Sequence, residues 1–188
     1  YEITCRDWSS DVCSYDLTKA TYVFCSTLLG LLANRKPDYL AMAMDVPSET
    51  LLRRQVDPNY KAQRQPMPED LPPQIDRIIQ IVAAMGIPIL TIPRFEADDV
   101  MATIASRTRS ENPDIDVYIV SRDKDLDQIL TDGVVLYDPA RDLEITPAAL
   151  LAEKGYTPAE ALEIQTLTGD ATDNVPGEIG RASCRERV

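Results

Sequence analysis

Acidic side chains concentrate in four short segments that lie far apart in the sequence. Taken singly, each segment has a plain structural explanation, because Asp and Glu cap helices, favour the first helical turn and occupy tight turns. Their repetition after successive apolar stretches is harder to assign to capping alone. The acids concerned are Asp45, then Glu96, Asp98 and Asp99, then Asp123 and Asp125, and finally Asp170 and Asp173.

Carboxylates gathered in one place need positive charge close by. Two of them about 4 Å apart repel by roughly 4 kcal/mol at an effective dielectric near 20, so a pocket of several acids requires bound cations or protons. The chain contains no histidine, and oxygen ligands alone suit hard ions such as Mg²⁺ or Mn²⁺ rather than zinc. Two such ions about 3.5–4 Å apart activate water and stabilise the leaving oxygen of a phosphodiester. The sequence therefore predicts a two-ion hydrolytic site if the acids converge.

Hydrophobic periodicity indicates the elements that would position these acids. Strand-like and helix-like stretches alternate, which predicts an α/β fold with a mostly parallel sheet and helices on both faces. Binding sites in such sheets form beyond the carboxyl ends of the strands, where the first three acidic segments stand. The expected strands are 39–44, 87–92, 117–121 and 134–137, and the expected helices are 20–35, 71–85, 96–107 and 124–130.

Two further segments complete this outline. From Thr146 onward, two short helices opened by Pro147 and Pro158 predict a small helical appendage that leads into the fourth acidic segment. Residues 47–73 are polar, rich in proline and basic in their first half, which indicates an exposed excursion from the sheet. The side chains in it that could contact nucleic acid are Arg53, Arg54, Tyr60, Lys61 and Arg64.

Composition limits the classes of partner. The formal net charge of −12 argues against indiscriminate coating of nucleic acid, because phosphate binding rests on Lys and Arg. No apolar stretch approaches the roughly 20 residues of a membrane-spanning helix, and no secretory leader opens the chain, so we expect a cytoplasmic protein without membrane contact. The four cysteines show no metal-ligand spacing and are given no role.

Four motifs closely resemble those of the 5′ nuclease domain of bacterial DNA polymerase I, within the flap endonuclease superfamily. They are YKAQR at 60–64, FEADDV at 95–100, SRDKDL at 121–126 and TGDATDNVPG at 168–177. The resemblance implies a PIN-like 5′ nuclease fold and a two-metal enzyme that cuts DNA, with RNA primer as a further substrate, at 5′ ends or flaps. Asp45, Glu96 and Asp98 would hold the first ion with support from Asp99. Asp123, Asp125, Asp170 and Asp173 would hold or support the second, with Asp123 facing both.

The same resemblance assigns the excursion at 47–73 to an arch for the displaced 5′ strand. Lys61 and Arg64 match positions that draw the scissile phosphate toward the metals, and we count them as catalytic. Arg53 and Arg54 would add positive charge, and the ring of Tyr60 would offer a face for a base to stack on. Phosphate contacts carry no base information, so we expect selectivity for DNA structure rather than sequence. We also expect a monomer associated with the bacterial nucleoid, whose parent either continues into a polymerase or stands alone.

The sequences at both ends of the chain indicate foreign tails. The stretches DWSSDVCSYDL at 7–17 and EIGRASCRERV at 178–188 resemble translated sequencing adapters. The expected organisation is therefore a tail at 1–17, a catalytic domain at 18–143, the truncated start of a helix-turn-helix DNA-binding subdomain at 144–177, and a second tail. The family's first strand, with another metal-binding Asp, and its monovalent ion site would both be missing. We expect such a chain to be catalytically impaired.

Other functions share parts of this pattern. A phosphorylation receiver domain needs one acceptor Asp with Thr and Lys and carries no fourth acidic segment. A haloacid-type phosphatase begins with Asp-x-Asp, whereas Asp45 is followed by Val46 and Pro47. A PIN-like ribonuclease is more similar to this chain, but that class has no arch and no GDATDN element. An inactive nucleic-acid-binding fragment is a further alternative.

Overall fold

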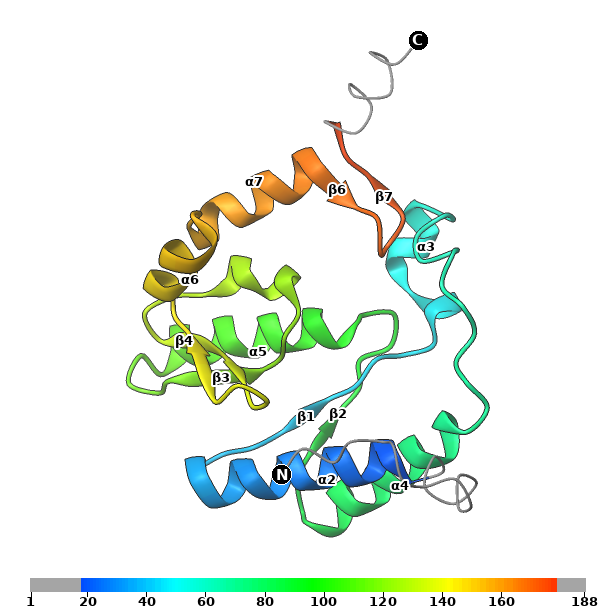
Figure 1. Ribbon diagram of the computed structural model, residues 1–188, viewed down its shortest axis with the longest axis vertical. Coiled ribbons are helices and arrows are strands. Elements are labelled where there is room, and N and C mark those ends of the chain that lie inside the picture. Colours follow the sequence, from blue (N-terminus) through cyan, green and yellow to red (C-terminus); the bar gives the residue numbers. More distant parts are fainter. Residues whose placement is uncertain (1–17, 179–188) are drawn as a thin grey trace, which may run out of the picture. The chain divides into compact units, whose positions relative to one another are not determined.

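The computed structural model describes residues 18–178, so the adapter-like segments at 1–17 and 178–188 lie outside it except for Glu178 (Figure 1). This part of the chain divides into two compact units. One contains residues up to 42 and 65–89, and the other contains 43–64 and the chain from 90 onward. Every acidic and basic side chain singled out above belongs to the second unit.

The first unit is built on two helices, α2 (Lys19–Arg35) and α4 (Leu71–Ala84). The side chain of Gln74 is buried and accepts a hydrogen bond of 2.8 Å from the Ala20 N–H. One of the backbone donors left open at the start of α2 is therefore satisfied by α4 rather than by a local cap. Gly86, at φ +73°, follows α4 and ends it as the sequence predicts.

Two short strands, β1 (Met42–Ala43) and β2 (Ile89–Leu90), pair with each other. The Met42 N–H donates to the Pro88 carbonyl at 2.9 Å, and the Met44 N–H donates to the Leu90 carbonyl at 3.0 Å. From the first bond to the second, the donor and the acceptor both advance toward the C-terminus of their strands, which is the pattern of a parallel pair. The strands predicted at 39–44 and 87–92 are therefore confirmed in place, although each is shorter than expected.

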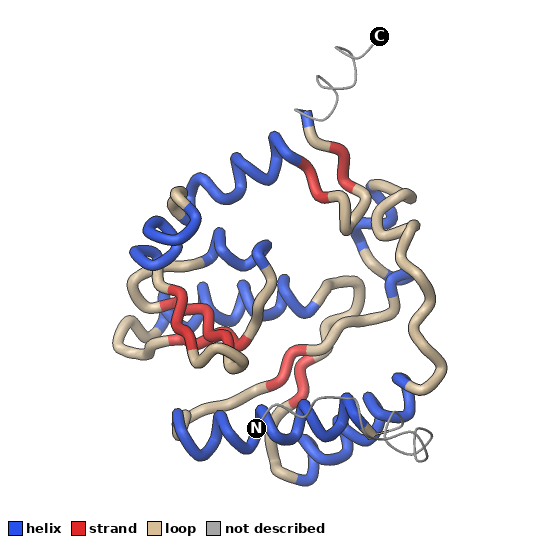
Figure 2. The backbone as a smooth tube through the Cα atoms, viewed as in Figure 1, coloured by secondary structure: helices blue, strands red, loops and turns tan. Residues whose placement is uncertain are grey.

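Between residues 97 and 138 the second unit alternates helices and strands as the sequence predicts (Figure 2). The excursion at 47–73 contributes only residues 47–64 to this unit, and it is not wholly irregular there, because it includes two short helical turns. In chain order the elements are η1 (Ser48–Thr50), α3 (Leu52–Val56), α5 (Ala97–Glu111), β3 (Val117–Val120), η2 (Lys124–Ile129), β4 (Val134–Asp138), β5 (Leu143–Ile145), α6 (Pro147–Lys154), α7 (Pro158–Thr168), β6 (Gly169–Asp170) and β7 (Val175–Pro176).

A three-stranded sheet of order β3-β4-β5 carries the hydrophobic core of this unit. Strands β3 and β4 are parallel, and β5 adds an antiparallel edge strand that the sequence analysis did not include. Helix α5 packs against β3, and α6 packs against β5. The buried core consists of Ala105, Ile119, Leu126, Leu130, Val134, Leu136 and Leu150.

Helices α6 and α7 begin as the proline positions predict. Thr146 and Thr157 cap them through their side chains, with Pro147 and Pro158 in the first turn. Thr157 also shares a capping box with Glu160, so the start of α7 is held on both sides. Within residues 18–178 no helix is long and apolar enough to cross a membrane.

Candidate metal and phosphate site

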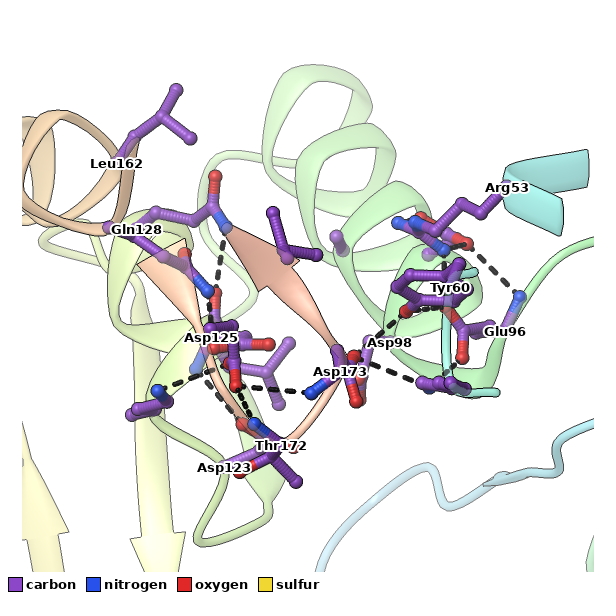
Figure 3. A pocket seen from close by; sticks show the side chains of 18 of the residues that line it. Arg53, Tyr60, Glu96, Asp98, Asp123, Asp125, Gln128, Leu162, Thr172 and Asp173 are labelled. Atoms are coloured by element: carbon purple, nitrogen blue, oxygen red, sulfur yellow. Dashed lines mark hydrogen bonds and ion pairs between the residues drawn. The ribbon is translucent and has the colours of Figure 1, made fainter. Parts of the chain in front are cut away.

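Seven of the eight predicted acids line one open pocket of about 520 Å³ in the second unit (Figure 3). In the figure, Arg53, Tyr60 and Glu96 stand on one side of the pocket, and Asp123 and Asp125 stand on the other. The structure thus brings together side chains from segments separated by more than a hundred residues. The lining acids are Glu96, Asp98, Asp99, Asp123, Asp125, Asp170 and Asp173.

Asp45, the eighth acid, does not line the pocket but lies at its edge. Its carboxylate accepts a hydrogen bond of 2.7 Å from the Ala97 N–H, at the start of α5. The N-terminal end of a helix carries the positive end of the helix dipole, so this contact stabilises the negative charge of Asp45. The charge of Asp45 also raises the pKa of Asp98, so the two carboxylates act on each other.

The start of α5 presents three acids by a local mechanism. Glu96 occupies the N-cap position and forms a capping box with Asp99, whose carboxylate accepts the Glu96 N–H at 3.0 Å. Arg53 then binds both oxygens of Asp99, at 2.6 and 2.7 Å. Burial raises the pKa of Asp99, but the hydrogen bond from Arg53 and the capping bond outweigh it and hold that pKa below its ordinary value.

Asp98 has the opposite electrostatic environment. Burial, followed by the charges of Asp123, Asp45 and Glu96, raises the pKa of Asp98 to about 6. Burial and the charges of Asp123 and Asp170 also raise the pKa of Asp125. These two acids therefore mark the part of the pocket where negative charge is least compensated.

The loop that carries Asp123 and Asp125 is fixed by its own turn and by a buried acid. Asp123 caps η2 by accepting the Asp125 N–H at 3.0 Å. Asp127, 1% exposed, accepts hydrogen bonds of 2.6 Å from Lys154 and 2.9 Å from Tyr156. This interaction ties η2 to α6 and its following loop. Asp127 was not among the predicted site residues, because an acid in an acidic motif gives no sign that it is structural.

The fourth acidic segment forms the hairpin of β6 and β7. Asp170 accepts the Thr172 N–H at 2.7 Å and pairs with Lys124 at 3.1 Å. Burial raises the pKa of Asp170, but the hydrogen bond from Lys124 and the backbone bonds together lower it. Asp170 and Lys124 thus join this hairpin to the η2 loop.

Residues 59–64 of the excursion are docked on the same hairpin. The Lys61 N–H, on a residue with φ +55°, donates to the Asp173 carbonyl at 3.0 Å. The Lys61 ammonium bonds to Glu96 and lies 3.6 Å from Asp173, and Arg64 bonds to Asp173 at 2.6 Å. The two basic residues predicted to be catalytic therefore lie at the pocket, where they neutralise acids.

Tyr60 is placed differently from the sequence expectation. Its side chain is buried, and its hydroxyl lies 2.8 Å from Glu96 and 2.9 Å from Asp173. Burial and both carboxylates raise its pKa. The ring is enclosed because the segment folds inward onto the acids, so in this conformation it offers no face to a base. Arg54, unlike Tyr60, does not line the pocket, and its Nε donates to the Tyr60 carbonyl at 3.2 Å.

The arrangement fits a hard cation in its donor chemistry but is not a formed metal centre. In the part of the chain that the structure describes, no three acids or cysteines form a group that could hold an ion as they stand. Arg53, Lys61 and Arg64 instead pair with the acids. Asp98, Asp123 and Asp125 make no ion pair within residues 18–178. Their oxygens are the donors that Mg²⁺ and Mn²⁺ prefer.

Comparison with known proteins gives consistent matches. The family model described as the 5′-3′ exonuclease, N-terminal resolvase-like domain, matches residues 13–155. The chain is 37% identical over 167 residues to DNA polymerase I of Mycobacterium bovis, covering 87% of this chain and 18% of that protein. It is 35% identical over 163 residues to a 5′-3′ exonuclease of Aquifex aeolicus, covering 87% and 55%. It thus spans about a fifth of the first relative and about half of the second.

A solved structure shares the fold at lower identity. It is the D15 flap endonuclease of bacteriophage T5 in a pseudo-enzyme–product complex with DNA and metal ions. The TM-score is 0.61 at 20% identity, covering 88% of this chain and 66% of that one.

Proposed function

Because the chain belongs to the 5′-3′ exonuclease family, we propose that it is the catalytic region of a metal-dependent, structure-specific 5′ nuclease. The reaction is the hydrolysis of phosphodiesters at the 5′ ends or flaps of duplex DNA, which we expect this chain to perform in impaired form. One observation carries this proposal: acids from three distant segments line a single pocket whose wall also holds Arg53, Lys61 and Arg64. Negative charge for cations and positive charge for phosphate are thus combined in one place.

The acids divide into two groups that suit two Mg²⁺ or Mn²⁺ ions. Asp45, Glu96 and Asp98, supported by Asp99, would hold one ion at the start of α5. The other would be held at the η2 loop and the β6–β7 hairpin by Asp123, Asp125, Asp170 and Asp173. When bound, such ions activate water and stabilise the charge that develops on a leaving oxygen.

The basic side chains have two successive partners in this proposal. In the structure, Lys61 and Arg64 neutralise Glu96 and Asp173. If these carboxylates held divalent cations, both side chains would be available to bind the phosphate beside the bond to be cut. Arg53, which holds Asp99 and Glu96, is placed to contribute in the same way. This exchange accounts for an acidic chain that binds nucleic acid.

The partners follow from the same reasoning. A DNA complex of the T5 flap endonuclease and the DNA polymerase I relatives support duplex DNA with a 5′ flap as the substrate and a parent fused to a polymerase. RNA primers present the same phosphodiester to the pocket and are included in the proposal. We further propose a monomer that works at the nucleoid in the bacterial cytoplasm.

Cleavage and binding of a labelled 5′-flap duplex test the proposal. We expect the chain to prefer the flap to single-stranded RNA, and any cleavage to require Mg²⁺ or Mn²⁺ and to stop with EDTA. Asp123→Asn should abolish cleavage while flap binding in Ca²⁺ persists. Asp114→Asn, in an exposed loop outside the pocket, is the matched control. Cleavage that survives Asp123→Asn, or equal binding of flap and single-stranded RNA, would contradict the proposal.

A further inference from the structure

Asp125 differs from its neighbours in what holds its carboxylate. Its Oδ1 accepts a hydrogen bond of 2.7 Å from the side-chain amide of Gln165, on α7. A neutral amide fixes the direction of a carboxylate and leaves its full negative charge, whereas Lys or Arg neutralises it. Neutralisation by Lys or Arg is seen instead at the ion-paired acids Glu96, Asp99, Asp170 and Asp173.

The position of Gln165 on α7 is unusual for a polar side chain. Gln165 is half-buried on the helix that packs against η2. Leu162 and Leu167 on the same helix are 54% and 48% exposed. Amphipathic helices ordinarily place apolar residues inward and polar ones outward. The inward position of Gln165 is therefore not explained by hydrophobic burial, and its bond to Asp125 supplies the reason.

We propose that Gln165 is a positioning residue that aims the Asp125 carboxylate at a divalent cation in the pocket. The inference rests on the proposed function, which assigns Asp125 to the second ion. Loss of a side chain that orients a metal ligand typically weakens metal binding by about 10–100-fold. Because α7 is held at its start by Thr157 and Pro158, the amide is fixed to a rigid element rather than to a loop.

The chain supplies a matched control for this contact. Gln128 also lines the pocket and also bonds to Asp125, but its amide donates to the backbone carbonyl, at 2.8 Å. Figure 3 shows Gln128 beside Asp125. Gln165→Met and Gln128→Met are thus the same chemical change at the same neighbour, and only the first removes a bond to the carboxylate.

Mn²⁺ binding measured by isothermal titration calorimetry, without substrate, tests the proposal. We expect Gln165→Met to lower the affinity for one of two Mn²⁺ ions by about 10–100-fold. Gln128→Met should leave both affinities within about twofold of wild type. In an Asp125→Asn background, Gln165→Met should have no further effect, because the ligand through which it acts has changed. Melting of the metal-free proteins verifies the fold, and Gln165→Ala serves as a second variant if the Met side chain disturbs packing.

Three results would contradict the proposed positioning role or the proposed function. Wild-type affinity in Gln165→Met and Gln165→Ala would overturn the positioning role. An equal loss with and without Asp125→Asn would also overturn it, because a general loosening of α7 acts in both backgrounds. Failure of the wild-type chain to bind Mn²⁺ would overturn the proposed function itself and is distinguished from the other two results by that control.

Discussion

Asp98→Asn should stabilise the metal-free protein near neutral pH, although it removes a side chain that we assign to metal binding. Burial and the charges of Asp123, Asp45 and Glu96 raise the pKa of Asp98 from 3.8 to about 6. The charged carboxylate is therefore less stable in the fold than in the unfolded chain. Asparagine keeps the shape of the side chain and removes the charge that opposes folding.

The pKa shift of Asp98 limits how much Asp98→Asn can raise the free energy of unfolding. One pKa unit corresponds to about 1.4 kcal/mol, so a change from 3.8 to about 6 sets an upper limit of about 3 kcal/mol. Asp98 is only partly buried, and solvent screening reduces the expected gain to about 1–2 kcal/mol.

The sign of the pH dependence follows from proton binding. Because its folded pKa is the higher one, Asp98 binds more protons in the folded chain than in the unfolded chain between pH 3.8 and about 6. Its contribution to stability therefore falls as the pH rises through this window. The advantage of Asp98→Asn should be complete above about pH 6 and absent below about pH 4.

Urea unfolding in EDTA at pH 7.5 and at pH 4 measures this difference, and Asp99→Asn is the control. The pKa of Asp99 is lowered, and the charge of Asp99 is held by Arg53, so its loss should destabilise the fold at pH 7.5, by about 1 kcal/mol. The neighbouring substitutions thus have opposite predicted signs. A less stable Asp98→Asn at pH 7.5, or a gain of equal size at both pH values, would refute the reasoning.

Three further substitutions extend the account. Asp127→Asn should cost about 1.5–3 kcal/mol in urea unfolding, because charged hydrogen bonds from Lys154 and Tyr156 are lost; an unchanged midpoint would contradict this anchor. Leu150→Ala, at a fully buried core position, should cost about 2–5 kcal/mol in the same assay, and a loss below about 1 kcal/mol would count against the assigned core. Lys61→Met should speed amide hydrogen exchange at 59–64, since its bond to Glu96 helps to dock this segment; unaltered exchange would show that the ammonium is not needed for docking.

The convergence of the acids was predictable because it depends on local rules. Strand ends and helix starts are visible in the sequence, and parallel strands bring their carboxyl ends to one edge. The acids at 96–99 and 123–125 do line one pocket, although β2 and β3, the strands that precede them, belong to separate sheets. Pro147 and Pro158 likewise marked the starts of α6 and α7.

The partners of the acids were not predictable, because they depend on contacts between distant segments. Tyr60 and Asp173 are separated by 113 residues, and only the family resemblance, not the local pattern of either segment, predicted that both lie at one site. The left-handed backbone of Lys61 turns this segment inward, and Lys is not a residue that signals such a conformation. Gln165 was missed because a single amide on a helix has no periodic pattern, and β5 was missed because three residues are too few to show alternation.

Anomalous diffraction from crystals of the chain soaked in Mn²⁺ tests the central claim most directly, because it locates the ions without relying on activity. Two anomalous peaks are expected in the pocket, one beside Asp98 and one beside Asp125, with Lys61 and Arg64 withdrawn from Glu96 and Asp173. Asp123 should lie next to both peaks. Manganese bound only at acids outside the pocket, with the ion pairs of Lys61 and Arg64 intact, would contradict the account.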